Sequence, residues 1–551
     1  MRKKNKNQRR SDRQGGMVLI VCLIILLMLS LIGIASVMTS NSEMQVAGNE
    51  MNQTGSFYTA EAGLEKAASE VKNSYLNTGA APNPLPSGQL TLNKFISNYQ
   101  VTDQGPAVLT TLTSGAYTGL YGLVKNFDIS STGFDNNNES SIVLDLDIQD
   151  ALMPLFQFAV FYQNDLEIAP GPDLTLGGRV HSNGNVYVQS VANLYVGSYL
   201  TSAGDIYHGP KPGGGSVENG NVFVNDGGGV YQNMRNNNGT FLDATDPDWV
   251  DLSQARWGGK VEDGNHGVTE LYMPVVTDGP LTDLIDRSSG NPDSYENRAG
   301  LKFVDGQAYY LQVSGTWVNV TVPLIACGAI TAGSFWDAHE GMTVQSLDIN
   351  MGALATSGYF PPNGIIYASV PDGATTLSAV RLKNGATLPA GMTLATNNPL
   401  YTVGDYNTVA KKPAALMADA LTILSSNWND ANSWGDLSTR NALATRLNAS
   451  YITGNLETGA GGHGYNGGLE NLPRFLENWS GITLTWRGSA ANLWYSRKAV
   501  GPWSHGIYYT APNWDWAFDI DLLDSTNLPP GTPRANLVLK TGWRQSIVSN
   551  D

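Results

Sequence analysis

The chain has 551 residues and a formal net charge of −16, so it can form more than one domain but is too acidic to favour nucleic acid or an anionic membrane as a partner. Charged residues make up only 15% of it and glycine is frequent, at 61 residues, which favours a β protein rich in turns. The two cysteines, Cys22 and Cys327, lie far apart and exclude a disulfide framework or thiolate metal site; each is predicted to be a small buried residue.

The first predicted element is a basic segment followed by an apolar helix. Residues 1–16 hold seven Lys and Arg residues and one Asp. Residues 17–42 carry no charge, and as a helix they span about 39 Å, enough to cross a hydrocarbon core of about 30 Å. This run is longer than a secretory signal needs, and its small residues, Gly15 and Gly16, precede it. The basic flank predicts a cytoplasmic N-terminus with the body on the other side of the membrane.

The helix is predicted to continue beyond the membrane, to about residue 76. Apolar side chains fall on one face at helical spacing, and Glu61 and Glu65 mark the solvated side. That apolar face consists of Phe57, Leu64, Ala68, Val71 and Tyr75. We therefore predict one long helix over residues 17–76, apolar all round at first and amphipathic later.

A leader ending in glycine, the start MVLI and the segment FYTAEAGLEKA occur together. Over roughly residues 10–75 the chain resembles type IV pilus assembly proteins of the PilX class, which belong with the minor pilins and the GspK-like pseudopilins. The resemblance implies that prepilin peptidase removes residues 1–16 by cutting between Gly16 and Met17, and that Met17 is then methylated. It further implies that the helix enters a filament core.

The chain departs from major pilins at the fifth mature position, where they usually carry Glu and this chain has Val21. A carboxylate inside a bilayer costs about 2.5–3.5 kcal/mol and needs a partner. In the family that partner is thought to be the amine of the subunit ahead, which a tip subunit lacks. We therefore expect a tip or priming subunit whose helix acts in assembly through Val21, Phe57, Glu61 and Leu64. A membrane-anchored protein that never enters a filament is the alternative.

Residues 77–150 are predicted to be a small β-rich connecting region. SSIVLDLDIQD alternates apolar and polar residues, as a half-buried strand does. Asp145 and Asp147 are two residues apart on that strand, which leaves calcium open as a weak hypothesis beside a solvated face.

Residues 151–425 are predicted to form a β body. Short β-branched or aromatic triplets recur every six to ten residues with Gly, Asn, Asp or Ser between them, too closely for intervening helices. This texture favours a β-solenoid or parallel β-helix, with a β-sandwich as the second choice. Residues 209–300 read as a Gly- and Asp-rich insertion.

Residues 426–551 are predicted to be a Trp-rich C-terminal region. Dense aromatics invite stacking on carbohydrate, but core or cap burial is the commoner role. The tryptophans in question are Trp479, Trp486, Trp503, Trp514 and Trp516.

Candidate catalytic groups are few. FWDAHEG places Asp337, His339 and Glu340 together, as ligands, an acid–base group or a turn. Acidic pairs can serve polysaccharide-cleaving enzymes, and Asp165, Glu167 and Asp173 are candidates for that role. No metal-binding histidine pair, phosphate loop or GxSxG motif is present. We predict that the protein is no enzyme and needs no cofactor, with calcium in the turns as the weak exception.

The fold prediction is thus a long pilin-type helix followed by a mainly β body. The functional prediction is a minor pilin-like subunit of a type IV pilus or related filament, located in the inner membrane and then at the pilus tip, with the body as an adhesin. Its expected partners are other minor and major pilins, prepilin peptidase, the inner-membrane assembly platform and a surface or glycan receptor, but no nucleic acid. The alternative is a single-pass anchored β-helix protein that binds or acts on polysaccharide.

Overall fold

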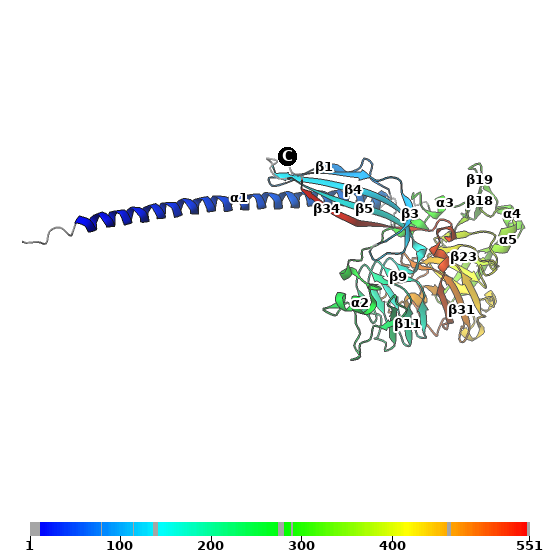
Figure 1. The fold of residues 1–551 in the computed structure, drawn as a ribbon. Helices are drawn as coiled ribbons and strands as arrows, with labels where there is room; N and C mark the ends of the chain where they lie inside the picture. Colours follow the sequence, from blue (N-terminus) through cyan, green and yellow to red (C-terminus); the bar gives the residue numbers. More distant parts are fainter. Residues whose placement is uncertain are drawn as a thin grey trace, which may run out of the picture.

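The computed structural model describes residues 12–78, 80–113, 115–135, 141–273, 280–287, 290–459 and 464–547. Most of the predicted leader, residues 1–11, lies outside these ranges. The prediction of a long apolar helix followed by a mainly β body is confirmed (Figure 1).

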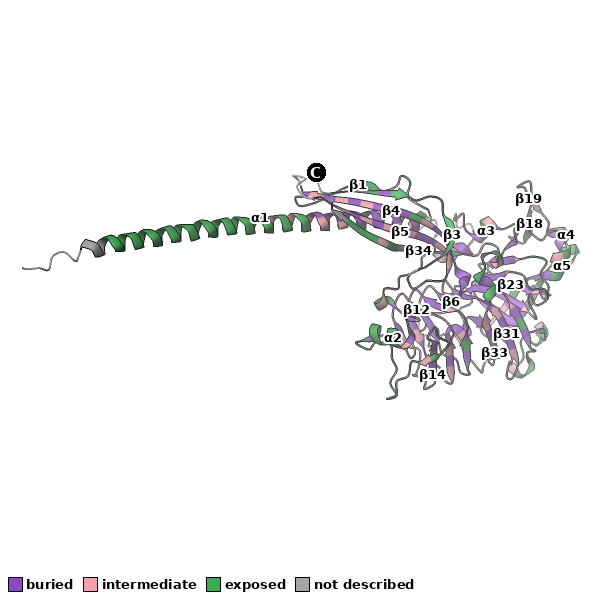
Figure 2. Cartoon of the chain, in the orientation of Figure 1, coloured by how far each residue is buried: buried purple, intermediate pink, exposed green. Residues whose placement is uncertain are grey.

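Helix α1 (Asp12–Thr78) is continuous for 67 residues, which corresponds to about 100 Å. Its N-terminal part projects from the rest of the molecule and is exposed on every side (Figure 2). In the part of the chain that the structure describes, this is the one helix that is long and apolar enough to cross a membrane. Beyond Gly55 one face becomes buried, and that face carries the predicted residues Leu64, Ala68, Val71 and Tyr75.

A six-stranded antiparallel sheet covers this buried face. Its main order is β1-β2-β4-β5-β34, and β3 pairs with β4. Alternate residues of β4 and β5 point toward the helix, which is why both strands alternate between buried and intermediate positions. The strands are β1 (Ser87–Leu92), β2 (Phe95–Asp103), β3 (Val108–Thr111), β4 (Tyr121–Asp135), β5 (Ser141–Pro154) and β34 (Arg534–Ile547).

Helix and sheet approach closely at two glycines. A Cβ at Gly63 would lie 2.5 Å from the hydroxyl oxygen of Ser131 and 2.7 Å from that of Ser97. A Cβ at Gly133 would collide with the carbonyl oxygen of Ser56. These positions let the helix backbone approach the sheet more closely than side chains would permit.

The β body is inserted between β5 and β34. Strand β34 comes from the C-terminal end of the chain but pairs with β5 along its whole length, with Arg534 opposite Pro154. The sequence predicts a connecting region over residues 77–150 and one C-terminal region over residues 426–551. In the structure, residues 87–154 and 534–547 share one sheet, because β34 completes it.

The first part of the body winds away from β5. Its first nine strands rotate through three sheets, and each of the first six pairs in parallel with the strand three later in the chain. Val180 pairs with Val160 on one side and with Leu200 on the other, so successive rounds are 20 residues long here. The strands are β6 (Phe158–Tyr162), β7 (Leu166–Ile168), β8 (Leu174–Leu176), β9 (Arg179–Ser182), β10 (Val186–Val188), β11 (Asn193–Val196), β12 (Leu200–Ser202), β13 (Ile206–His208), β14 (Asn221–Asn225), β15 (Tyr231–Asn233) and β16 (Val261–Glu262).

The second part begins at the opposite end of the body and winds back. Strand β17 starts it, and β32 ends beside β6, with Ala490 opposite Val160. The strands are β17 (Leu301–Val304), β18 (Gln307–Leu311), β19 (Trp317–Asn319), β20 (Ile330–Asp337), β21 (Met342–Asn350), β22 (Ile365–Ser369), β23 (Leu377–Lys383), β24 (Met392–Thr396), β25 (Leu400–Val403), β26 (Ala414–Ala418), β27 (Leu421–Leu424), β28 (Thr445–Asn448), β29 (Ser450–Thr453), β30 (Pro473–Arg474), β31 (Thr483–Gly488), β32 (Ala490–Asn492) and β33 (Asn513–Phe518).

The two parts meet in one twelve-stranded sheet, ordered β16-β12-β9-β6-β32-β29-β26-β24-β22-β17-β18-β19. The first strand of the insert, β6, therefore lies beside β32, which is the last strand that the insert contributes to this sheet. The parallel ladders are those that a parallel β-helix would contain; that specific fold stays a prediction.

Strands in the middle of this sheet are buried on both faces. In β22, Ile366 and Ala368 belong to the core of the body, whereas Tyr367 belongs to a second cluster. The second cluster also contains Val124 of β4 and Leu537 of β34. The body and the helix-covering sheet thus share an apolar core, which holds them together.

Short helices complete the fold: α2 (Trp249–Trp257), α3 (Tyr295–Arg298), α4 (Thr321–Ala326) and α5 (Met351–Thr356). The prediction that both cysteines are buried is wrong, although both are free as expected. Cys327 caps the C-terminus of α4 on the surface, and Cys22 lies on the part of α1 that has no neighbour.

Candidate functional site

Helix α1 presents the predicted processing and assembly residues in two environments. Gly16 is exposed, and a Cβ there would meet no atom of the described residues within 4 Å. Met17 is 69% exposed and Val21 is 49% exposed, so both are free to contact other molecules.

The second environment lies where α1 meets β34. Leu64 is buried against the sheet, and Phe57 lies edge-on to Trp543 with ring centroids 6.1 Å apart. Glu61 and Leu64 line a cavity of about 320 Å³ together with residues 540–543 of β34. The structure therefore separates the exposed residues at the start of the helix from Phe57, Glu61 and Leu64, which contact the chain's own sheet.

Helix α1 contains the part of the chain that is similar to a known protein family. Residues 15–65 match the family model described as PilX N-terminal. The start of this chain is therefore similar to the N-terminal region of PilX proteins. The predicted resemblance is confirmed there, and the exposed apolar PilX helix fits a single-pass membrane anchor in a minor pilin-like pilus component.

The whole chain was also compared with solved structures and with curated protein sequences. The crystal structure of the competence-associated pilin ComZ from Thermus thermophilus aligns with 90% of this chain and 98% of its own, at 11% sequence identity and a TM-score of 0.26. No curated protein sequence matches the chain.

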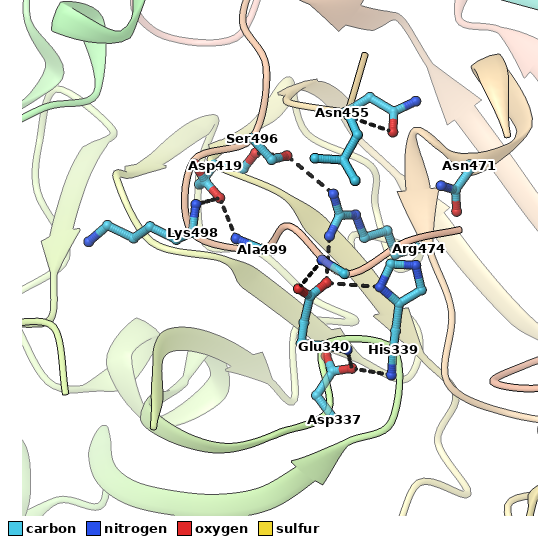
Figure 3. Close-up of polar contacts among 12 residues, drawn as sticks. Asp337, His339, Glu340, Asp419, Asn455, Asn471, Arg474, Ser496, Lys498 and Ala499 are labelled. Carbon is cyan, nitrogen blue, oxygen red and sulfur yellow. Dashed lines mark hydrogen bonds and ion pairs between the residues drawn. The ribbon is translucent and has the colours of Figure 1, made fainter. Parts of the chain in front are cut away.

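Outside the PilX region, Asp337, His339 and Glu340 do lie together (Figure 3). Glu340 accepts hydrogen bonds from His339 Nδ1 at 2.9 Å and from Arg474 Nη1 at 2.7 Å. Asp337 accepts hydrogen bonds from the backbone N–H groups of His339 and Glu340 and from the Tyr401 hydroxyl at 2.6 Å.

The cluster is nearly closed to solvent. The side chains of His339, Glu340 and Arg474 are 2%, 4% and 3% exposed. Burial raises the pKa of Asp337. Burial also pushes the pKa of Glu340 upward, but the hydrogen bond from His339 and the charge of Arg474 outweigh it and hold that pKa below its ordinary value. A substrate cannot reach these buried groups. Their hydrogen bonds and the ion pair between Glu340 and Arg474 connect the β20–β21 turn to β30.

The acidic candidates at the start of the body mostly fix turns. Asp165 accepts the backbone N–H of Asn185 at 2.9 Å, and Asp173 accepts that of Asn193 at 3.1 Å, each 20 residues ahead. Glu167 is buried and accepts the Thr458 hydroxyl at 2.6 Å. Asp165 and Asp173 thus join successive rounds of the body, whereas Glu167 joins its first part to the segment around Thr458.

A Ser–His–Asp arrangement occurs that the sequence motifs did not reveal. Ser253 Oγ lies 2.6 Å from His266 Nε2, and His266 Nδ1 lies 2.8 Å from Asp263 Oδ1. Ser253 and Asp263 are fully buried, and Asp263 also accepts the Trp249 indole N–H. The distances match those of a catalytic triad, but the buried Ser253 cannot contact a substrate. The hydrogen bonds instead connect α2 to the turn that follows β16.

Metal ligands are not grouped in the described parts of the chain: no set of three or more His, Cys, Asp or Glu side chains there could hold an ion. Asp147 accepts a hydrogen bond from Arg544 of β34 at 2.7 Å. The calcium hypothesis stays a hypothesis.

The C-terminal tryptophans divide by burial. Trp479, Trp486 and Trp516 are buried, so core burial is confirmed for them. Trp503 and Trp514 are half-buried. The most exposed tryptophan described is instead Trp434, at 62%.

Glu470 supports a prediction about pH. Burial raises its pKa to about 8, whereas the unfolded chain has an ordinary glutamate pKa of about 4.3. The folded state thus holds the proton more tightly, and stability is lost as pH rises from about 5 to 8, by up to about 1.4 kcal/mol per pH unit. We expect Glu470→Gln to remove that loss in urea unfolding at pH 5.5 and 8.5. Glu457→Gln, at a solvated glutamate nearby, is the control; an unchanged pH dependence in Glu470→Gln would contradict the prediction.

Proposed function

We propose that this protein is a minor pilin-like subunit at the tip of a type IV pilus or related filament, and that its β body is an adhesin. The position of the body supports this most strongly. It is inserted between adjacent strands of the sheet that covers the PilX helix and shares an apolar core with that sheet. Assembly through the helix and display of the body are thereby combined in one rigid unit.

The tip location rests on two features. Val21 supplies no carboxylate for the amine of a subunit ahead. The body also extends well to one side of the α1 axis (Figure 1), where a subunit inside the shaft would meet its neighbours. Only the end of a filament leaves that space open.

The proposal includes maturation and location. Prepilin peptidase removes residues 1–16 and methylates Met17. The helix first anchors the subunit in the inner membrane with its N-terminus in the cytoplasm, as the basic leader favours. The assembly platform and other minor and major pilins then receive the subunit, and no catalytic step is assigned to it.

One experiment tests the two halves of the proposal separately. Strands β5 and β34 are antiparallel neighbours, so a short turn can replace residues 155–533 while keeping the sheet. Filaments should form with both the full chain and the excised chain, and the mass of the N-terminus in sheared filaments should be that of methylated Met17. Adherence should be lost only with the excised chain.

Other outcomes contradict specific parts. An intact Met1 found only in membranes would remove the pilus role and leave an anchored surface protein acting on polysaccharide as the better explanation. Full adherence by the excised chain would remove the adhesin role.

A further inference from the structure

The exposed Trp434 stacks on Trp336 at the surface of the body. Their ring centroids are 4.5 Å apart and the rings are inclined by 26°. Because Trp336 covers only one face of Trp434, the other face is open to solvent. Trp434 is 62% exposed, so the stacked pair presents an aromatic surface that a partner can contact.

Hydrogen bonds fix the positions of Trp336 and of the loop that carries Trp434, which together form an aromatic platform. The backbone N–H of Trp336 donates a hydrogen bond of 2.8 Å to the hydroxyl of Ser433, which precedes Trp434 in the chain. Asp430, three residues earlier, accepts two hydrogen bonds from the buried Arg381, at 2.6 and 3.0 Å. The loop that carries Trp434 is therefore anchored in the core, so binding there would cost little ordering of the side chain.

An uncharged strip leads away from the platform. On the face of β20 and β21 that carries Trp336, the cross-strand pair Trp336–Thr343 is followed by Ser334–Gln345 and then by Ala332–Leu347, all of them exposed or partly exposed. Four residues of strand separate Trp336 from Ala332, which corresponds to about 13 Å. The strip therefore suits an extended ligand.

The strip ends in a cavity of about 540 Å³ that includes Ala332, Gln345 and Leu347. None of the described residues that line the cavity is charged, although the whole chain has a net charge of −16. The polar groups there are amides and hydroxyls, from Gln307, Thr321, Thr331, Gln345, Ser346 and Ser369. An apolar cavity with a few amides and hydroxyls is typical of a binding site for a neutral molecule.

This surface is also well placed for contact. The cavity is lined by residues of α4, β17, β20 and β21. Helix α4 lies at the end of the molecule farthest from the N-terminus of α1 (Figure 1). A partner could approach this end without meeting the membrane or the filament.

We propose that the Trp434–Trp336 platform and the adjoining cavity, here called the distal groove, bind a neutral glycan chain. The C–H-bearing face of a pyranose ring is apolar and fits the electron-rich face of an indole. Its hydroxyls match the amides and hydroxyls of the groove, and an uncharged chain incurs no repulsion from the acidic protein. This inference deepens the adhesin role and rests on it.

The test is calorimetric titration of the full chain with cellohexaose, maltohexaose and chitohexaose, in a polyoxyethylene detergent because a sugar-based detergent would compete. At least one hexasaccharide should bind. Trp434→Ala should weaken that binding at least tenfold, and Ala332→Trp, which fills an exposed position in the groove, should do the same. Trp543→Ala is the matched control, because Trp543 is 51% exposed but lies on β34.

Several results would overturn the proposal. These are no binding of any of the three hexasaccharides, unchanged binding by Trp434→Ala, or binding only of a heparin hexasaccharide or an apolar peptide. Circular dichroism of each variant checks its fold. If excision of the body abolishes adherence but Trp434→Ala does not, the adhesin role stands and the glycan site fails; if neither change matters, the proposed function itself fails.

Discussion

A chain that ends at Pro533 is expected to lose the folded sheet around helix α1. Removing β34 breaks a strand pairing that runs the whole length of β5 and takes the buried Ala535 and Leu537 out of the core. Each backbone hydrogen bond contributes roughly 1 kcal/mol, and a buried leucine such as Leu537 contributes roughly 2–5 kcal/mol. Their sum is comparable with the entire stability of a domain, about 5–15 kcal/mol.

The loss also leaves polar groups unpaired. Asp150 of β5 accepts a hydrogen bond from Asn536 of β34, and burial raises the pKa of Asp150 to about 7. Without β34 the edge of β5 becomes an unpaired template for aggregation. We expect limited proteolysis of the truncated chain to cut within residues 87–154 at least ten times faster than in the full chain.

The control keeps β34 and removes only its surface ion pairs. Lys540 pairs with Glu65 at 2.6 Å, and Arg544 pairs with Asp147 at 2.7 Å, all four side chains being largely solvated. Exposed pairs contribute about 0–1 kcal/mol. The double variant Lys540→Ala, Arg544→Ala should therefore resist protease as the full chain does. Equal resistance of the truncated chain would show that β34 is dispensable.

Gly16→Leu is expected to block removal of the leader and to exclude the protein from filaments. No atom of the described residues lies within 4 Å of a Cβ at Gly16, so the substitution should leave the fold intact and act only on the proposed cleavage by the peptidase. We expect the cleaved fraction, measured by mass spectrometry of the N-terminus, to fall at least tenfold. The protein should then accumulate in membranes and be absent from sheared filaments.

Gly33→Leu provides the comparison, because Gly33 lies on the same exposed helix and a Cβ there also meets no atom within 4 Å. Cleavage of Gly33→Leu should equal that of the natural chain. If Gly16→Leu is cleaved normally, Gly16 is not the processing residue, and the proposed maturation is wrong.

The topology explains how a large body can be inserted into the sheet that covers helix α1. An insert between two neighbouring strands must begin and end at nearly the same place. Here the chain starts in the middle of the body at β6, winds outward to β16, crosses to β17 and winds back to β32 beside β6. The helix-covering sheet therefore keeps its register while the body extends from it.

The amino-acid sequence by itself determined the features that depend on local pattern. The uncharged run of residues 17–42 and the spacing of Leu64, Ala68, Val71 and Tyr75 predict the helix and its buried face, because helical periodicity places neighbours three or four residues apart on one side. The alternation in SSIVLDLDIQD likewise predicts β5. The PilX segment is recognisable for the same reason, since its residues are contiguous.

Only the tertiary structure decided the features that depend on distant residues. The pairing of β34 with β5 and the exposed stack of Trp434 on Trp336 each join segments far apart in the chain, and no local periodicity encodes such pairings. A tryptophan also looks the same in the sequence whether its side chain is buried in a core, as that of Trp479 is, or exposed to solvent, as that of Trp434 is. What covers a side chain is a property of the fold, and it separates a core residue from a binding surface.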